Sequence, residues 1–123
     1  MTEAARDLLQ RADAALRAAE SLTRSEQHDI AVGRAYYVMY YCAQALLGGD
    51  AGRFKKHAGV HAAFGERFAR TGRLDPKYHR WLLAAYQKQL YAEVLRRADA
   101  VEAVAQARDF LQATLAHLAP AEP

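Results

Sequence analysis

One segment constrains the fold more than any other. Residues 31–47, "AVGRAYYVMYYCAQALL", would be apolar around most of the circumference of a helix. Neighbouring elements must cover such a helix on most sides to keep its apolar surface from water. Gly48 and Gly49 follow directly, and glycine readily adopts the left-handed conformation that closes a helix. The pattern therefore predicts a central helix over residues 29–47.

Helical spacing continues along the rest of the chain. Residues 3–22, 57–71 and 99–118 repeat apolar side chains at steps of three and four, which predicts three amphipathic helices. Gly72 is well placed to end the second of them. No β-branched alternation typical of strands is present.

The strongest local signal for the start of a helix is "LDPKYHRWLL". Asp75 is suited to the N-cap, and Pro76 to the first helical position, where its missing N–H costs nothing. A further helix is therefore expected to run to about residue 95. Together the five segments predict an all-α protein, an antiparallel up-and-down bundle of four or five helices.

Length and composition indicate a single domain over residues 1–123, in which 119–123 form a short C-terminal tail. The chain is 52% hydrophobic and 25% charged, as expected for a globular domain. Charged residues interrupt every apolar stretch before it could span a bilayer, and no secretory signal is recognised at the N-terminus. A single cysteine, Cys42, excludes an internal disulfide, so a cytoplasmic location is the default expectation.

A group of polar residues is expected to lie along one edge of the central helix. Arg34, Tyr37 and Tyr41 share a helical stripe, while Gln89 and Glu93 end an otherwise apolar face of the fourth predicted helix. A buried guanidinium must meet a carboxylate, a phenol or an anion. These residues therefore predict either a polar layer within the bundle or a shallow pocket or dimer seam that accepts a phosphate.

Basic residues gather in the middle of the chain. The net charge is only +3, from 17 basic and 14 acidic residues, which is too small to establish nucleic-acid binding. The candidates for binding an anion or RNA are Arg53, Lys55, Lys56, Arg67, Arg70 and Arg73. Either this segment is a solvated surface, or it meets an anionic partner such as RNA, a nucleotide or an acidic subunit.

Metal or thiol chemistry is not expected. His57 and His61 have the four-residue spacing of metal ligands, but no carboxylate lies between them and no third ligand is evident. They are interpreted as residues of the helix start and of the packing. Cys42 lies among small residues of the central helix, where a buried, inert thiol is expected. No metal and no cofactor is predicted.

Two stretches together resemble the HEPN domain family. "GRAYYVMY", from Gly33 to Tyr40, is similar to a second-helix motif of one branch of that family, approximately S-R-A-Y-Y-A-M-F. "KKHAGV" and the stretch from Phe64 to Leu74 are similar to the following loop and third helix of the same branch. The resemblance covers about residues 3–118. It implies a small helical bundle, often encoded beside a minimal nucleotidyltransferase.

The resemblance also indicates where catalysis would lie. HEPN ribonucleases carry R-x(4–6)-H late in the bundle, and this branch tends to read R-x-x-A-D-Y near the end of the fourth helix. Here Gln89 stands at the arginine position, Glu93 at the aspartate and Val94 at the tyrosine. Arg73 and His79 have the ribonuclease spacing, but a helix begins between them, so the match is interpreted as chance.

The resemblance therefore implies a binding or regulatory subunit without the standard catalytic motif. We expect a homodimer that associates with a minimal nucleotidyltransferase in a toxin–antitoxin-like pair. Two alternatives remain open. One is a metal-independent ribonuclease toxin with a non-standard site that includes Arg34, Tyr37, Gln89 and Glu93. The other is a nucleotide- or RNA-binding module that uses the basic segment.

Overall fold

The computed structural model describes residues 1–91 and 94–119. Its α-helices are α1 (Glu3–Arg24), α2 (His28–Leu47), α3 (His57–Phe64), α4 (Lys77–Tyr91) and α5 (Arg97–Leu118). A 3₁₀-helix, η1 (Gly48–Arg53), follows α2, and a π-helix, η2 (Gly65–Ala69), follows α3. The described part of the chain contains no strand, so the prediction of an all-α fold is confirmed.

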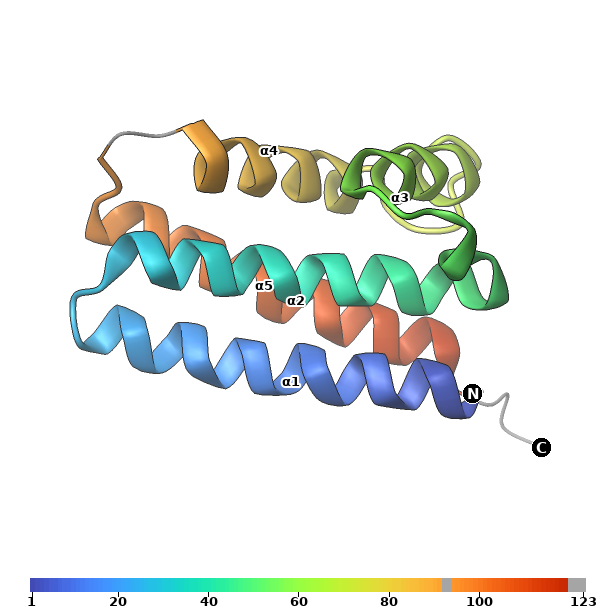
Figure 1. Ribbon diagram of the computed structural model, residues 1–123, viewed down its shortest axis with the longest axis horizontal. Helices are drawn as coiled ribbons and strands as arrows, with labels where there is room; N and C mark the ends of the chain where they lie inside the picture. The colour runs from blue at the N-terminus through green and yellow to red at the C-terminus, as the bar shows by residue number, and fades with distance from the viewer. Residues whose placement is uncertain (92–93, 120–123) are drawn as a thin grey trace.

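Helix α2 lies at the centre of the bundle. It runs antiparallel to α1, with α5 behind it and with α3 and α4 on the side away from α1 (Figure 1). It contacts each of the other four α-helices. Its stripe of small residues is at most 2% exposed and consists of Ala31, Ala35, Val38, Cys42 and Ala45. The predicted central position of this helix is therefore confirmed.

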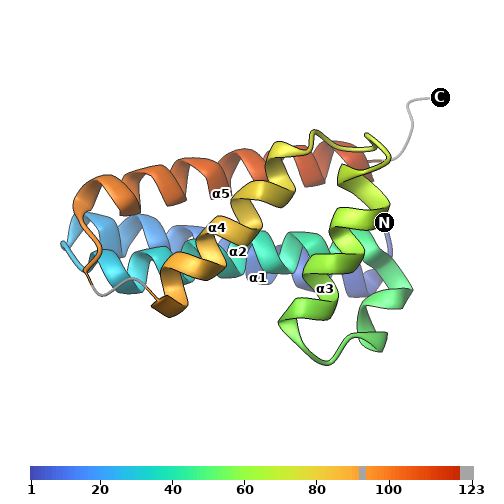
Figure 2. The ribbon, with the colours of Figure 1, turned by 90° about the horizontal axis from the view of Figure 1, so that it is seen from above.

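The face of the bundle that carries α3 and α4 positions the polar residues discussed below. Seen from above, α4 crosses α2 and α5 obliquely, and α3 lies over the C-terminal end of α2 (Figure 2). Both α3 and α4 contact α2 and each other, so three helices meet on this face. None of the described helices is long and apolar enough to cross a membrane.

Some helix ends form where the local sequence predicts them. Gly48 ends α2 with a φ of +64°, and Gly72 has a φ of +73° after η2. Both angles lie in the left-handed region, which glycine adopts without strain. The backbone N–H of Lys77 donates to Asp75 Oδ1 at 2.9 Å, so Asp75 caps the start of α4 as predicted.

The third predicted helix, 57–71, is only partly an α-helix. It is α-helical to Phe64 and continues as a π-helix to Ala69, where the N–H of Arg70 donates to the carbonyl of Gly65 at 2.9 Å. Large side chains recur here every four residues, which is longer than the α-helical period of 3.6. The wider π turn keeps Phe68 stacked on Phe64, with ring centroids 5.5 Å apart.

Two further boundaries differ from the prediction. The fourth helix was expected to reach about residue 95, but α4 ends at Tyr91 and residues 94–96 are not helical. The next helix, α5, begins at Arg97, and the N–H of its N-cap Arg96 donates to Asp99 Oδ2 at 2.9 Å. The segment 48–56, which was expected to be a loop, contains η1.

Gly65 allows η2 to approach α4 closely. A Cβ atom at this position would lie 2.6 Å from His79 Cε1 and Nε2. We expect Gly65→Ala to lower the free energy of unfolding by about 1–3 kcal/mol, because the imidazole must move away. Urea unfolding followed by circular dichroism measures the change. The control is Gly52→Ala, since no atom lies within 4 Å of a Cβ there. Equal midpoints for the two variants would contradict this account.

Candidate functional site

Aromatic and imidazole side chains gather where α2, α3 and α4 meet. We call this group the tyrosine–histidine cluster. It consists of Tyr36, Tyr37 and Tyr40 from α2, His57 and His61 from α3, and Tyr86 from α4. Positions four residues apart on a helix lie above one another, so each of α2 and α3 presents a pair of rings to the other. The cluster is the largest concentration of polar aromatic atoms in the part of the chain that the structure describes.

The Tyr36 hydroxyl joins the two histidines. It lies 2.6 Å from His57 Nδ1 and 2.7 Å from His61 Nε2. A phenol has one proton, so it donates to one imidazole and accepts from the N–H of the other. Tyr36 is 0% exposed, and a buried hydroxyl without partners would be costly. The two histidines therefore supply the partners that this phenol needs.

The rings around the two histidines fix their orientation. His57 stacks on Tyr40, with ring centroids 4.2 Å apart and an angle of 10° between the planes. His61 meets Tyr86 edge to face at 4.8 Å. The Nε2–H of His79, from α4, donates to the backbone carbonyl of His61 at 3.1 Å. All three helices thus contribute to holding the imidazoles in place.

Burial sets the protonation states of the cluster. It lowers the pKa of His61 to about 4, and the neighbouring His57 and His79 add to this effect. Burial also lowers the pKa of His57 and raises the pKa values of Tyr36 and Tyr40. Both histidines are therefore neutral at pH 7, and the Tyr36 phenol keeps its proton. A neutral, partly exposed imidazole such as His57 is able to accept a proton at neutral pH.

The predicted stripe Arg34, Tyr37 and Tyr41 stays together along α2, because the ring centroids of Tyr37 and Tyr41 are 5.8 Å apart. Tyr37 belongs to the tyrosine–histidine cluster, and the Arg34 guanidinium lies over its ring at 4.9 Å. Arg34 and Tyr41 also line a shallow hollow against α1, where Arg11 is a neighbour. Arg34 forms no ion pair with any residue in 1–91 or 94–119. Glu93, the carboxylate considered for it, lies outside the described residues.

Gln89 packs against Gly33 of α2, one helical turn from Tyr37. A Cβ on Gly33 would be 3.8 Å from Gln89 Cγ, so the amide side chain packs where α4 crosses α2. Its Oε1 is buried without a hydrogen-bond donor among the residues that the structure describes.

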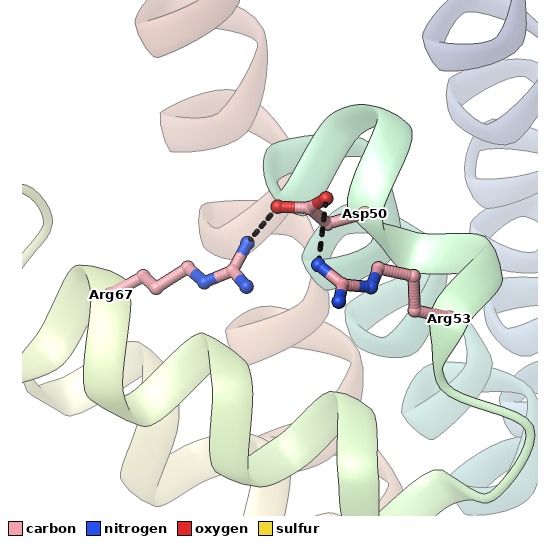
Figure 3. A network of polar contacts seen from close by, with 3 residues as sticks. All are labelled: Asp50, Arg53 and Arg67. Carbon is pink, nitrogen blue, oxygen red and sulfur yellow. Dashed lines mark hydrogen bonds and ion pairs between the residues drawn. The ribbon is translucent and has the colours of Figure 1, made fainter.

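Nearby carboxylates neutralise part of the predicted anion-binding segment. Asp50 accepts from Arg67 at 2.7 Å and lies 3.7 Å from Arg53 (Figure 3). Arg70 pairs with Glu66. The Arg73 guanidinium lies over the Phe68 ring at 4.4 Å, and Lys55 and Lys56 are exposed without an ion pair to another described residue. Of the six candidates, these two lysines are therefore the most available to bind an anion.

Three residues that the sequence raised as possible chemistry have packing roles. Cys42 is 0% exposed, and burial raises the pKa of its thiol to about 12, so the thiolate is not available at neutral pH. Arg73 contacts Phe68, whereas His79 contacts His61, so the pair with ribonuclease spacing faces different partners. No group of three or more His, Cys, Asp or Glu side chains suited to a metal occurs in the described ranges.

Sequence reasoning did not identify Tyr36, His57, His61 and Tyr86 as one cluster. One signal was available, because Tyr36 and Tyr40 on one helix and His57 and His61 on another share the same four-residue spacing. That spacing places each pair on one face but does not say that the two faces meet. The contact spans 21 and 25 residues of chain and depends on the tertiary packing of α3 on α2.

Tyr36→Phe tests the hydrogen bonds of this cluster. The variant keeps the ring but leaves two buried imidazole nitrogens without their shared partner. We expect the free energy of unfolding to fall by about 1–3 kcal/mol, as for other buried polar groups that lose a partner. Tyr91→Phe is the control, because Tyr91 is 71% exposed and should change stability little. Equal thermal midpoints for the two variants would contradict the role given to the Tyr36 hydroxyl.

Comparison with known proteins agrees with this architecture. The family model described as "HEPN domain" matches residues 5–118. The chain is 34% identical to "UPF0332 protein glr0978" of Gloeobacter violaceus, over 97% of this chain and 99% of that protein. It is 38% identical to "Putative toxin MJ0142" of Methanocaldococcus jannaschii, over 70% of this chain and 58% of that protein. It is 35% identical to "Putative toxin MJ0605" of the same organism, over 70% and 64%. The chain therefore belongs to the HEPN domain family.

Proposed function

We propose that this HEPN protein is a binding and regulatory subunit of a two-component toxin–antitoxin-like pair in the cytoplasm. In this proposal it forms a homodimer and associates with a minimal nucleotidyltransferase. Family membership supports the toxin–antitoxin setting, and so do the names of two relatives, both of which begin "Putative toxin". The resemblance of the α2 and α3 motifs to a branch often encoded beside such enzymes supports the partner.

One observation carries the non-catalytic part of the proposal. Gln89 occupies the position on α4 where this branch tends to have arginine, and it packs against Gly33 of α2. A neutral amide neither transfers a proton at neutral pH nor neutralises the negative charge that develops on a phosphoryl group. A site centred on this position therefore lacks the cation that metal-independent RNA cleavage would need.

Exposed apolar residues on α4 support self-association. Leu83, Leu90 and Tyr91 have large exposed side chains on this helix, and Val94 follows them in the chain. Leu83 and Leu90 are seven residues apart and so lie on one side of α4, and exposed apolar residues on one face of a small domain are typical of a protein interface. The outward side of α4 is therefore the surface that we assign to the homodimer.

Leu90→Asp tests this dimer. Size-exclusion chromatography with light scattering should give twice the mass of one chain for the wild type and the mass of one chain for the variant, because a charge would be buried in the interface. Leu115→Asp on α5 is the matched control, since Leu115 is 43% exposed and Leu90 is 46% exposed. The control should remain dimeric. A monomeric wild type that also fails to bind a minimal nucleotidyltransferase would refute the proposal.

A metal-independent ribonuclease is the second candidate function. It is favoured by the neutral, partly exposed His57. The ring centroids of His57 and Tyr37 are 5.8 Å apart, and the Arg34 guanidinium lies over the Tyr37 ring. His57 would act as the base towards a ribose hydroxyl, and Arg34 would contact the phosphate. This arrangement uses the α2–α3 side of the cluster and does not require an arginine at position 89.

Incubation with total RNA in the presence of a chelator distinguishes the two functions. For the regulatory subunit we expect no cleavage by the wild type, because Gln89 replaces the expected cation. Cleavage by the wild type that is lost in Arg34→Ala and kept in Arg17→Ala would establish the ribonuclease instead. Arg17 is a suitable control because it lies on α1 and pairs only with the exposed Asp13 among the described residues.

A further inference from the structure

Helix α3 is short. In the chain, a non-helical stretch precedes it and a π-helix follows it. It spans the eight residues His57–Phe64, after η1 and an extended stretch, and it continues into the π-helix η2. One polar contact with the central helix anchors its first turns, the Tyr36 hydroxyl between His57 and His61. We propose that these three residues form an acid-sensitive latch, which holds α3 on α2 while both imidazoles are neutral and loosens it when either imidazole takes up a proton.

The hydrogen-bond stoichiometry of the cluster gives the reason. In the neutral state Tyr36 donates its one proton to one imidazole and accepts from the other. Protonation turns the accepting imidazole into a second donor, so both nitrogens then point N–H groups at the same phenol oxygen. The phenol proton must turn away, and Tyr36 is 0% exposed with no other hydrogen-bond partner in the described part of the chain. A buried donor without an acceptor opposes this state.

The charge itself also lacks compensation. The titratable groups that face the two histidines are the phenols of Tyr36, Tyr37 and Tyr40 from α2, and Tyr86 and His79 from α4. Within 1–91 and 94–119 no carboxylate forms an ion pair with either histidine. The acidic residue of η1, Asp50, is engaged by Arg67 and Arg53. An imidazolium at His61, which is 5% exposed, would therefore be buried and unpaired, which is strongly unfavourable.

The pH range of the latch follows from linkage. Burial lowers the pKa of His61 to about 4, whereas a histidine released to water has a pKa of about 6.5. The latched form thus binds protons less readily than the released form. The latch is fully stable above about pH 6.5 and weakens as the pH falls towards 4. From His61 alone, the equilibrium constant for release rises about 30-fold between pH 7.5 and pH 5.

Hydrogen–deuterium exchange of the full chain tests the proposal. After correction for intrinsic rates, we expect protection of the amides in 57–64 to fall about 30-fold from pH 7.5 to pH 5. Protection in α1 and α5 should stay the same. The double variant His57→Gln and His61→Gln should remove this pH dependence, because an amide can share hydrogen bonds with Tyr36 but does not titrate. His117→Gln, which changes an exposed histidine of α5, should leave it intact.

A second measurement keeps the test independent of how well the double variant folds. An NMR titration of the wild type should show His57 and His61 titrating below the value of about 6.5 of a histidine in water. Equal protection of α3 at both pH values, or titration of both cluster histidines near 6.5, would overturn the latch. Loss of protection in all helices at once at pH 5 would also overturn it, because that result describes global unfolding rather than release of α3.

Discussion

Burial of α2 on most of its sides is the constraint on which the rest of the structure depends. Val32, Val38 and Met39 are fully buried, and each large side chain removed from water contributes about 1.5–3 kcal/mol. A single neighbouring helix covers only one side, so α2 needs α1, α5, α3 and α4 around it. The stripe of small residues on α2 allows these helices to approach closely. The up-and-down order follows, because short connections join antiparallel neighbours.

The same burial creates the polar chemistry of the protein. Tyr36 lies on α2 and is as deeply buried as its apolar neighbours, so its hydroxyl must find partners inside the bundle. Helix α3 provides them through His57 and His61. The cluster is therefore part of the core, and neutral imidazoles, phenols and a nearby guanidinium meet in it. Packing and chemistry depend on the same residues at this junction.

The fold of the family and the chemistry of its ribonucleases depend on different parts of the chain. The motifs of α2 and α3 position the core. In this protein the family model matches residues 5–118. The late part of α4 departs from the pattern, since Gln89 packs against Gly33 in place of an arginine. A helical bundle tolerates such a change, because a partly buried amide fits beside glycine without altering the helices around it. Fold membership therefore does not by itself imply activity.

The sequence alone determined the class of fold, the central helix and some helix ends. These features depend on local chemistry, namely the spacing of apolar residues, the positive φ angles of Gly48 and Gly72, and the cap at Asp75. Only the tertiary structure decided that Tyr36 meets His57 and His61, that Gln89 packs against Gly33, and that Asp50 neutralises Arg67. Periodicity places a residue on a face of its own helix. Which faces meet depends on how all five helices pack together around α2.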